Sequence, residues 1–125
     1  MEIKEDVKEI TINLSEMFEG DDFLGSRYDG EQVRKLEDEL ILKYGHKVVL
    51  NFDGIKGITQ SFGDEVAGIY ARAFGVDFIK QNIRAINMNE NVKFVLNASI
   101  KLSVKYGQKV TKQKEVNNGN SNQIE

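Results

Sequence analysis

Residues 47–75, KVVLNFDGIKGITQSFGDEVAGIYARAFG, decide the fold of this chain. Residues 47–52 are almost continuously apolar, as in a strand that is covered on both faces. After a glycine-containing loop, residues 62–74 carry an apolar stripe at helical spacing: Phe62, Val66, Ile69, Ala73 and Phe74. A buried strand, a loop and an amphipathic helix in this order predict one unit of an α/β domain.

Strands and helices alternate on both sides of this stretch. Residues 8–14 and 82–88 alternate between apolar and polar side chains, as strands do. Residues 31–44 and 90–106 repeat their apolar side chains at helical spacing. Phe23 and Leu24 form either a short further strand or a docked loop. We therefore expect an α/β fold, with a small mixed or mostly parallel sheet, about three main helices and right-handed crossovers.

Glycine marks the end of each predicted helix in a chain that contains no proline. Gly45, Gly75 and Gly107 each follow the last apolar residue, where a left-handed backbone turn favours glycine. Asp29 is expected to cap the helix over residues 31–44. Apolar periodicity is lost from Gln108 onward. Residues 1–107 are therefore predicted to form one domain, and residues 108–125 a flexible polar tail.

Composition excludes several kinds of chemistry. The 125 residues include no cysteine, which excludes disulfides, thiolate nucleophiles and cysteine-ligated metal sites. The single histidine, His46, leaves no histidine pair for a catalytic metal, and we expect it on the surface. Neither a phosphate-binding loop nor a dinucleotide fingerprint occurs. We expect no catalytic residue, no metal and no cofactor.

The charge distribution argues against nucleic acid and membrane as partners. The net charge is −3, with thirteen acidic and five basic side chains in residues 1–40, and six lysines against two acids in residues 91–125. A nucleic-acid binder usually presents a broad basic face instead. No apolar run approaches the length of a membrane span, and the N-terminus is too acidic for a signal peptide. A cytoplasmic protein is expected.

The segment around Ser61 is the most informative for function. Ser61 is predicted to cap the second helix, over residues 62–74, with Asp64 at the third helical position and Glu65 beside it. The two acidic residues suit the positive end of the helix dipole, and neighbours on a helix do not converge on one atom. Ser61 has two interpretations. It acts only as a cap, or its hydroxyl is exposed where an added phosphate would meet free backbone N–H groups.

This segment resembles the central strand, loop and helix of STAS domains, the fold of anti-sigma factor antagonists. It is closer still to a STAS-like family of small bacterial proteins. The residues that match the family's run are Phe52, Gly54, Ile55, Ser61, Phe62, Asp64 and Glu65. Upstream, Arg27 and Gly30 match the Arg-x-x-Gly lead into the first helix. Asn51 stands in place of an aspartate, and the Asp-Ser-Ser/Thr-Gly phospho-acceptor is absent, so the resemblance places a possible acceptor at Ser61, with Thr59 second.

The resemblance implies a non-catalytic regulatory module that binds a protein, such as an ATPase of the histidine-kinase type that acts as its kinase. We expect the partner surface on the loop and the exposed side of the second helix: Ile55, Lys56, Gln60, Ser61, Asp64, Glu65 and Arg72. A structural or homo-oligomeric subunit without a phospho-switch is the alternative, in which the strand over residues 8–14 pairs with a copy at a sheet edge. A small enzyme or nucleotide binder is the third interpretation.

Overall fold

The main sheet of the protein has three parallel strands. In the computed structural model, which describes residues 6–121 and the side chains of residues 6–107, their order is β1 (Glu9–Asn13), β3 (Lys47–Asn51) and β5 (Ile83–Ile86). The short strands β2 (Phe23–Leu24) and β4 (Gly57–Ile58) form a second parallel pair. The predicted α/β class with a small parallel sheet is confirmed.

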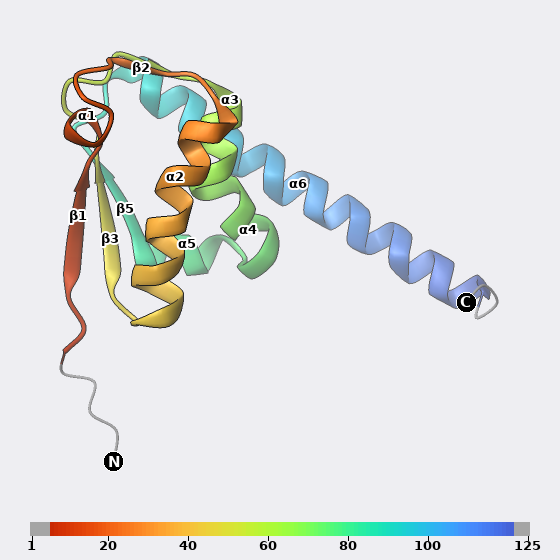
Figure 1. Cartoon of the computed structure of the whole chain (residues 1–125). Helices are drawn as coiled ribbons and strands as arrows, with labels where there is room; N and C mark the ends of the chain where they lie inside the picture. Colours follow the sequence, from red (N-terminus) through yellow and green to blue (C-terminus); the bar gives the residue numbers. More distant parts are fainter. Residues whose placement is uncertain (1–5, 122–125) are drawn as a thin grey trace.

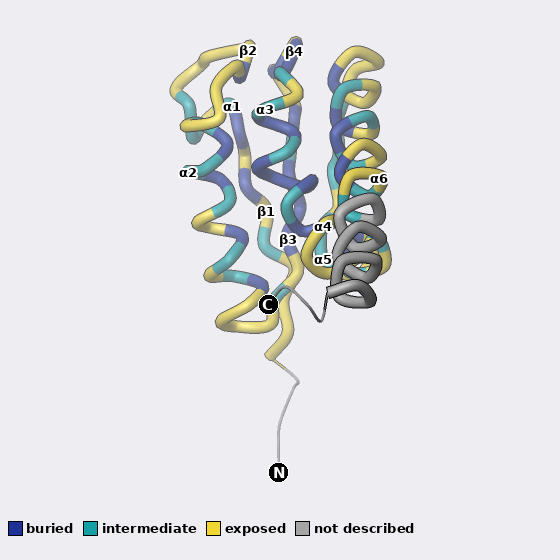
Figure 2. The backbone as a smooth tube through the Cα atoms, turned by 90° about the vertical axis from the view of Figure 1, so that its right-hand side faces the viewer, coloured by how far each residue is buried: buried dark blue, intermediate teal, exposed yellow. Residues whose placement is uncertain are grey.

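Helices cover one face of the main sheet, as Figures 1 and 2 show. Two of the long helices contain a π-helical turn, labelled η, that continues directly from an α-helical segment. The helical segments, in chain order, are α1 (Leu14–Met17), α2 (Arg27–Glu37), η1 (Asp38–Lys43), α3 (Gln60–Gly63), η2 (Asp64–Gly68), α4 (Ile69–Phe74), α5 (Val76–Asn82) and α6 (Glu90–Ser121). We refer to the continuous stretch of α3, η2 and α4 as the central helix, because it lies between α2 and α6 (Figure 2).

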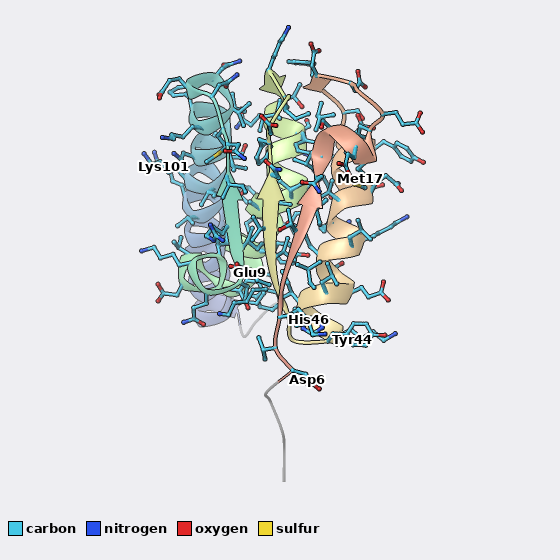
Figure 3. The ribbon with its side chains drawn as sticks, turned by 90° about the vertical axis from the view of Figure 1, so that its left-hand side faces the viewer. Asp6, Glu9, Met17, Tyr44, His46 and Lys101 are labelled. Carbon is cyan, nitrogen blue, oxygen red and sulfur yellow. The ribbon has the colours of Figure 1, made fainter. Side chains whose placement is uncertain are left out.

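The register of the strands separates the two faces of the sheet. Ile12 pairs with Leu50, and Leu50 pairs with Ala85, so these side chains share the face that packs against the helices. Within residues 6–121, no helix covers the opposite face (Figure 3). There, an ion pair of 3.1 Å joins Glu9 to Arg84 across β3. The sheet therefore has one apolar face and one largely polar face.

The apolar residues of the stretch 47–75 form much of the core. Leu50, Phe52, Phe62 and Val66 are all buried, and they lie in one cluster with residues of β1, α2 and α6. Burial of such a side chain contributes roughly 1.5–3 kcal/mol to folding. Phe52 and Phe62, which the family resemblance singled out, thus have a structural role.

Two helices begin earlier than the sequence patterns predicted. Ser26 caps α2, accepting a hydrogen bond of 3.0 Å from the backbone N–H of Asp29, so the expected cap at Asp29 is wrong. Thr59 caps the central helix, accepting a bond of 3.2 Å from the backbone N–H of Phe62. The expected cap at Ser61 is therefore also wrong. In both cases a hydroxyl residue further upstream satisfies the free N–H groups.

Two of the three glycines that were predicted to end helices do so, and one does not. Gly45 and Gly75 have φ values of 73° and 92°, as their role at helix ends requires. Gly107 does not end a helix, because α6 continues through it to Ser121. That residues 108–125 form a flexible tail remains a prediction, and residues 122–125 lie outside the described residues. The sequence patterns also missed α1, α5 and β4.

Candidate interaction site

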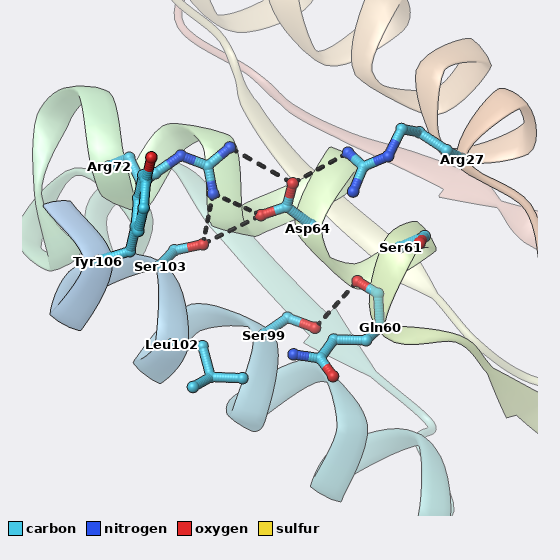
Figure 4. A pocket seen from close by; sticks show the side chains of 9 residues that line it. All are labelled: Arg27, Gln60, Ser61, Asp64, Arg72, Ser99, Leu102, Ser103 and Tyr106. Atoms are coloured by element: carbon cyan, nitrogen blue, oxygen red, sulfur yellow. Dashed lines mark hydrogen bonds and ion pairs between the residues drawn. The ribbon is translucent and has the colours of Figure 1, made fainter.

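Asp64, at the start of η2, is bound by two arginines from different helices. Its Oδ1 accepts hydrogen bonds from Arg72 Nη1 at 2.6 Å and from the Ser103 hydroxyl at 3.0 Å. Its Oδ2 accepts a bond of 3.0 Å from Arg27 Nη1. Arg72 Nη1 also donates to Ser103 Oγ at 2.8 Å, which ties α4 to α6 (Figure 4). Asp64 thus connects α2, the central helix and α6.

Glu65 extends this arrangement toward the other end of α2. Its Oε2 accepts from Arg27 Nη1 at 2.8 Å, and its Oε1 accepts from Arg34 Nε at 2.8 Å. Arg34 also pairs with Asp38 at 3.3 Å, and the Tyr70 hydroxyl donates to Asp38 at 2.5 Å. We call the alternating series Arg72, Asp64, Arg27, Glu65, Arg34 and Asp38 the charge ladder.

The charge ladder changes the interpretation of the adjacent acidic residues. The helical pattern predicts that neighbouring carboxylates do not converge, yet Asp64 and Glu65 both bind Nη1 of Arg27. Both lie in the π-helical turn η2 rather than in regular α-helix. Such turns are rare and occur often at functional sites. Arg27 therefore joins two carboxylates that the sequence pattern assigned only to the helix dipole.

Hydrogen bonds set the ionisation of both carboxylates. Burial acts to raise the pKa of Asp64, but the bonds from Arg72, Arg27 and Ser103 outweigh it and hold that pKa below its ordinary value. In Glu65, burial is likewise outweighed by the bonds from Arg34 and Arg27, and the pKa is lowered. The bond to Glu65 in turn raises the pKa of Arg27. Asp64 and Glu65 are therefore ionised at neutral pH.

Small residues let the helices approach closely enough to form the ladder. A Cβ at Gly30 of α2 would lie 2.6 Å from Cβ of Glu65. A Cβ at Gly63 would overlap Ser99, and one at Gly68 would overlap Asp64 and Ser103. The central helix therefore packs against α2 through Gly30 and against α6 through Gly63 and Gly68.

Gly30→Ala is expected to destabilise the fold by about 1–3 kcal/mol, because the added methyl group must push α2 away from η2. Urea denaturation measures this loss. Gly107→Ala is the matched control, since Gly107 is also helical but its added Cβ would lie 3.9 Å from the nearest atom. The control should be neutral or stabilising, by up to about 1 kcal/mol. Equal stability of the Gly30 variant and the wild type would contradict the close packing.

A pocket of about 390 Å³ opens between the central helix and α6, and we call it the α3–α6 pocket. The residues that line it come from α2, the central helix and α6 (Figure 4): Arg27, Gln60, Ser61, Asp64, Arg72, Ser99, Leu102, Ser103 and Tyr106. The pocket thus contains one end of the charge ladder, several hydroxyl groups and two apolar side chains.

The two candidate phospho-acceptors differ in their surroundings. Ser61 is half-buried and lines the α3–α6 pocket, on the first turn of the central helix. The hydroxyl of Thr59 caps that helix and also donates to the carbonyl of Gly25 at 3.1 Å. Modification of Thr59 would remove the cap. Thr59 is half-buried as well, so the difference between the two is that modification of Ser61 would leave this cap in place. Phosphorylation of Ser61 remains a prediction.

The structure brings together four of the seven residues predicted for the partner surface. Gln60, Ser61, Asp64 and Arg72 line the α3–α6 pocket, and Arg27 of the family motif joins them. Of the other three, Lys56 is exposed and forms an ion pair of 3.4 Å with Asp22, whereas Ile55 belongs to the core and Glu65 is buried in the charge ladder. Gly54 has a φ of 87°, so it permits the turn after β3.

The contribution of α6 to the pocket was not predicted from the sequence. Leu102 and Tyr106 belong to the apolar repeat that predicts a helix over residues 90–106, yet both side chains are exposed. Ser99 and Ser103 are buried in their place against the central helix. The signal was the recurrence of small residues at every fourth position, Ser99, Ser103 and Gly107, which is typical of a face that packs closely.

His46 has a structural partner that the sequence did not reveal, because its Nδ1 accepts a bond of 3.1 Å from the backbone N–H of Lys8. Within the described part of the chain, no group of three or more acidic, histidine or cysteine residues is placed to hold a metal ion. No helix there is both long and apolar enough to cross a membrane.

Comparison with known protein families places this geometry in context. Residues 29–93 match the model of a family described as a STAS-like domain of unknown function (DUF4325). The chain belongs to this STAS-like family. The match covers β3, the central helix and β5, and it includes Gly30, Ser61 and the acidic pair Asp64 and Glu65. Searches among curated proteins and solved structures gave no significant match. Membership of the STAS-like family suggests a regulatory role in protein interaction.

Proposed function

We propose that this chain is a non-catalytic regulatory module that binds a partner protein at the α3–α6 pocket. One observation carries the proposal: side chains from α2, the central helix and α6 meet at one accessible pocket beside Ser61. The pocket lies at the start of the helix on which the STAS-like resemblance rests. By that resemblance, the partner is an ATPase of the histidine-kinase type.

Phosphorylation of Ser61 would switch this surface. A phosphate group adds a charge of about −1.5 to −2 and three strong acceptor oxygens at neutral pH. Ser61 shares the pocket with Arg27 and Arg72, which both bind Asp64. A phosphate would compete with Asp64 for these arginines, because guanidinium groups bind phosphate strongly. The modification would therefore alter the end of the charge ladder that faces the partner.

Pull-down of the full chain from its native cell tests the proposal. We expect Ser61→Glu to change recovery of an ATPase partner about tenfold, equivalent to about 1.4 kcal/mol of binding free energy. Asn97→Glu is the matched control, because it adds the same charge at an exposed position of α6 that does not line the pocket. Failure to recover a partner, or equal recovery by both variants, would contradict the proposal.

A homo-oligomeric subunit is the second candidate, and the position of β1 favours it. In the described part of the chain, β1 is an edge strand of the main sheet, so one side of its backbone faces no neighbouring strand there. A second copy would add its own β1 there and extend the sheet across a twofold axis. Light scattering over a range of protein concentrations checks this candidate. A monomer at every concentration would exclude it.

A further inference from the structure

The arginines at the α3–α6 pocket are more exposed than their acidic partners. The side chains of Arg27 and Arg72 are 50% and 33% exposed, against 17% for Asp64 and 5% for Glu65. The carboxylates neutralise the charge of the arginines but leave part of each arginine side chain exposed. A partner approaching this face therefore meets guanidinium groups, although the whole chain carries a net charge of −3.

Arg27 has donors left for a partner. Its bonds to Asp64 and Glu65 both use Nη1. Among the interactions of the described residues, none uses its Nε or Nη2. These two groups form one edge of the guanidinium plane, and such an edge binds a carboxylate through two parallel hydrogen bonds. Half of the Arg27 side chain is exposed, and binding through Nε and Nη2 would leave its bonds to Asp64 and Glu65 in place.

The wall of the pocket that α6 supplies includes two exposed apolar side chains beside its buried serines. Leu102 and Tyr106 are 50% and 61% exposed, and both line the pocket together with Arg72. They follow each other at a spacing of four residues on the same helix, so they lie on one side of it. An anchor that inserts an apolar side chain between such residues contributes much of the energy of a small interface.

We infer that the α3–α6 pocket binds an acidic segment of a partner protein, with a carboxylate on Arg27 and an apolar side chain against Leu102 and Tyr106. This inference rests on the proposed function and specifies the chemistry of its partner. An amphipathic helix meets the requirement, since acidic and apolar side chains three or four residues apart share one face. The exposed arginines supply the charge complementarity, and the two side chains of α6 supply the apolar contact.

A nucleic acid fits this surface less well than an acidic peptide. A protein that binds DNA typically neutralises roughly 6–10 phosphates along a basic stripe. The α3–α6 pocket offers two arginines, both already bonded to Asp64. Among the described residues that line it, Tyr106 is the single aromatic side chain on which a base could stack. Binding of an oligonucleotide at this pocket is therefore the competing outcome of the test below.

Selection of phage-displayed random peptides against the full chain tests the inference. We expect the enriched peptides to combine aspartate or glutamate with leucine or an aromatic residue. Leu102→Asp should weaken binding of an enriched peptide at least about tenfold, because it replaces the apolar contact with a repelling charge. Arg27→Lys, which keeps the charge but loses the guanidinium edge, should weaken binding several-fold. Leu42→Asp on η1 is the matched control, since Leu42 is equally exposed but does not line the pocket.

The outcomes separate this inference from the proposed function. Enriched peptides that are neutral or basic but still require Leu102 would overturn the acidic partner and leave the interaction surface in place. Peptides that bind Leu102→Asp as tightly as wild type, a lack of enrichment, or tighter binding of an oligouridylate at the pocket would also overturn the inference. The proposed function itself fails if the pull-down recovers no partner, or if the Ser61→Glu and Asn97→Glu variants behave alike in it.

Discussion

Glu65→Gln is expected to lower the free energy of unfolding by about 2–3 kcal/mol at neutral pH. The substitution preserves the shape of the side chain but leaves Arg34 and Arg27 without the carboxylate that each of them binds at 2.8 Å. Removal of one partner from a fully buried ion pair costs about 3–5 kcal/mol. The loss is smaller here because the arginine side chains are 26% and 50% exposed, so water screens part of their charge.

Urea denaturation of Glu65→Gln beside Glu39→Gln measures this loss. Glu39 is exposed on η1, so its substitution should change stability by no more than about 0.5 kcal/mol. The pH dependence supplies a second check. The folded-state pKa of Glu65 is lowered, so its contribution is present above the unfolded pKa and is lost as pH falls through the folded pKa. Glu65→Gln should lose less stability on acidification than wild type. An unchanged acid profile would contradict the ladder.

Glu37→Met is expected to raise the free energy of unfolding by about 2–3 kcal/mol at neutral pH. Glu37 is completely buried, and neither of its carboxyl oxygens has a hydrogen-bond partner among the residues that the structure describes. Burial, with a smaller contribution from Asp38, raises its pKa well above the ordinary value. A carboxyl group in such a position costs free energy whether it stays protonated or ionises. Methionine has a similar volume and no polar atoms, so it relieves this cost.

The sign of the pH effect distinguishes Glu37 from Glu65. Because the folded-state pKa of Glu37 is raised, the folded chain keeps a proton that the unfolded chain releases above about pH 4.5. Stability therefore falls as pH rises beyond that value, by up to about 1.4 kcal/mol per pH unit, until the folded pKa is passed. Denaturation at several pH values between 5 and 8 checks this. We expect the slope in wild type and not in Glu37→Met; the same slope in both would refute the assignment.

Local patterns were sufficient to predict the framework of the fold. Alternation over residues 8–14 and 82–88, and the apolar run over residues 47–52, predicted the three strands of the main sheet. The first residue of each helix was harder to predict. Asp29 and Ser61 have side chains that often cap helices, but Ser26 and Thr59 precede them in the sequence and form the caps. Gly107 failed as a stop because a glycine inside a helix has the same sequence signature as one beyond its end.

The site was less accessible to sequence reasoning because tertiary contacts build it. Arg27 and Glu65 are 38 residues apart, and Arg72 and Ser103 are 31 residues apart, so no local spacing reveals either pair. The family resemblance named Arg27, Gly30, Asp64 and Glu65 without explaining them. The structure supplies the reason, since Gly30 lets α2 approach Glu65 and Arg27 then reaches both carboxylates.

Hydrogen–deuterium exchange on the chain in complex with its recovered partner tests the central claim most directly, because it locates the surface that the partner covers. Binding at the α3–α6 pocket predicts slower exchange over residues 60–72 of the central helix and residues 99–106 of α6, with β1 unchanged. Slower exchange confined to β1, with no change around Ser61 and Leu102, would contradict it and favour pairing at the edge of the sheet.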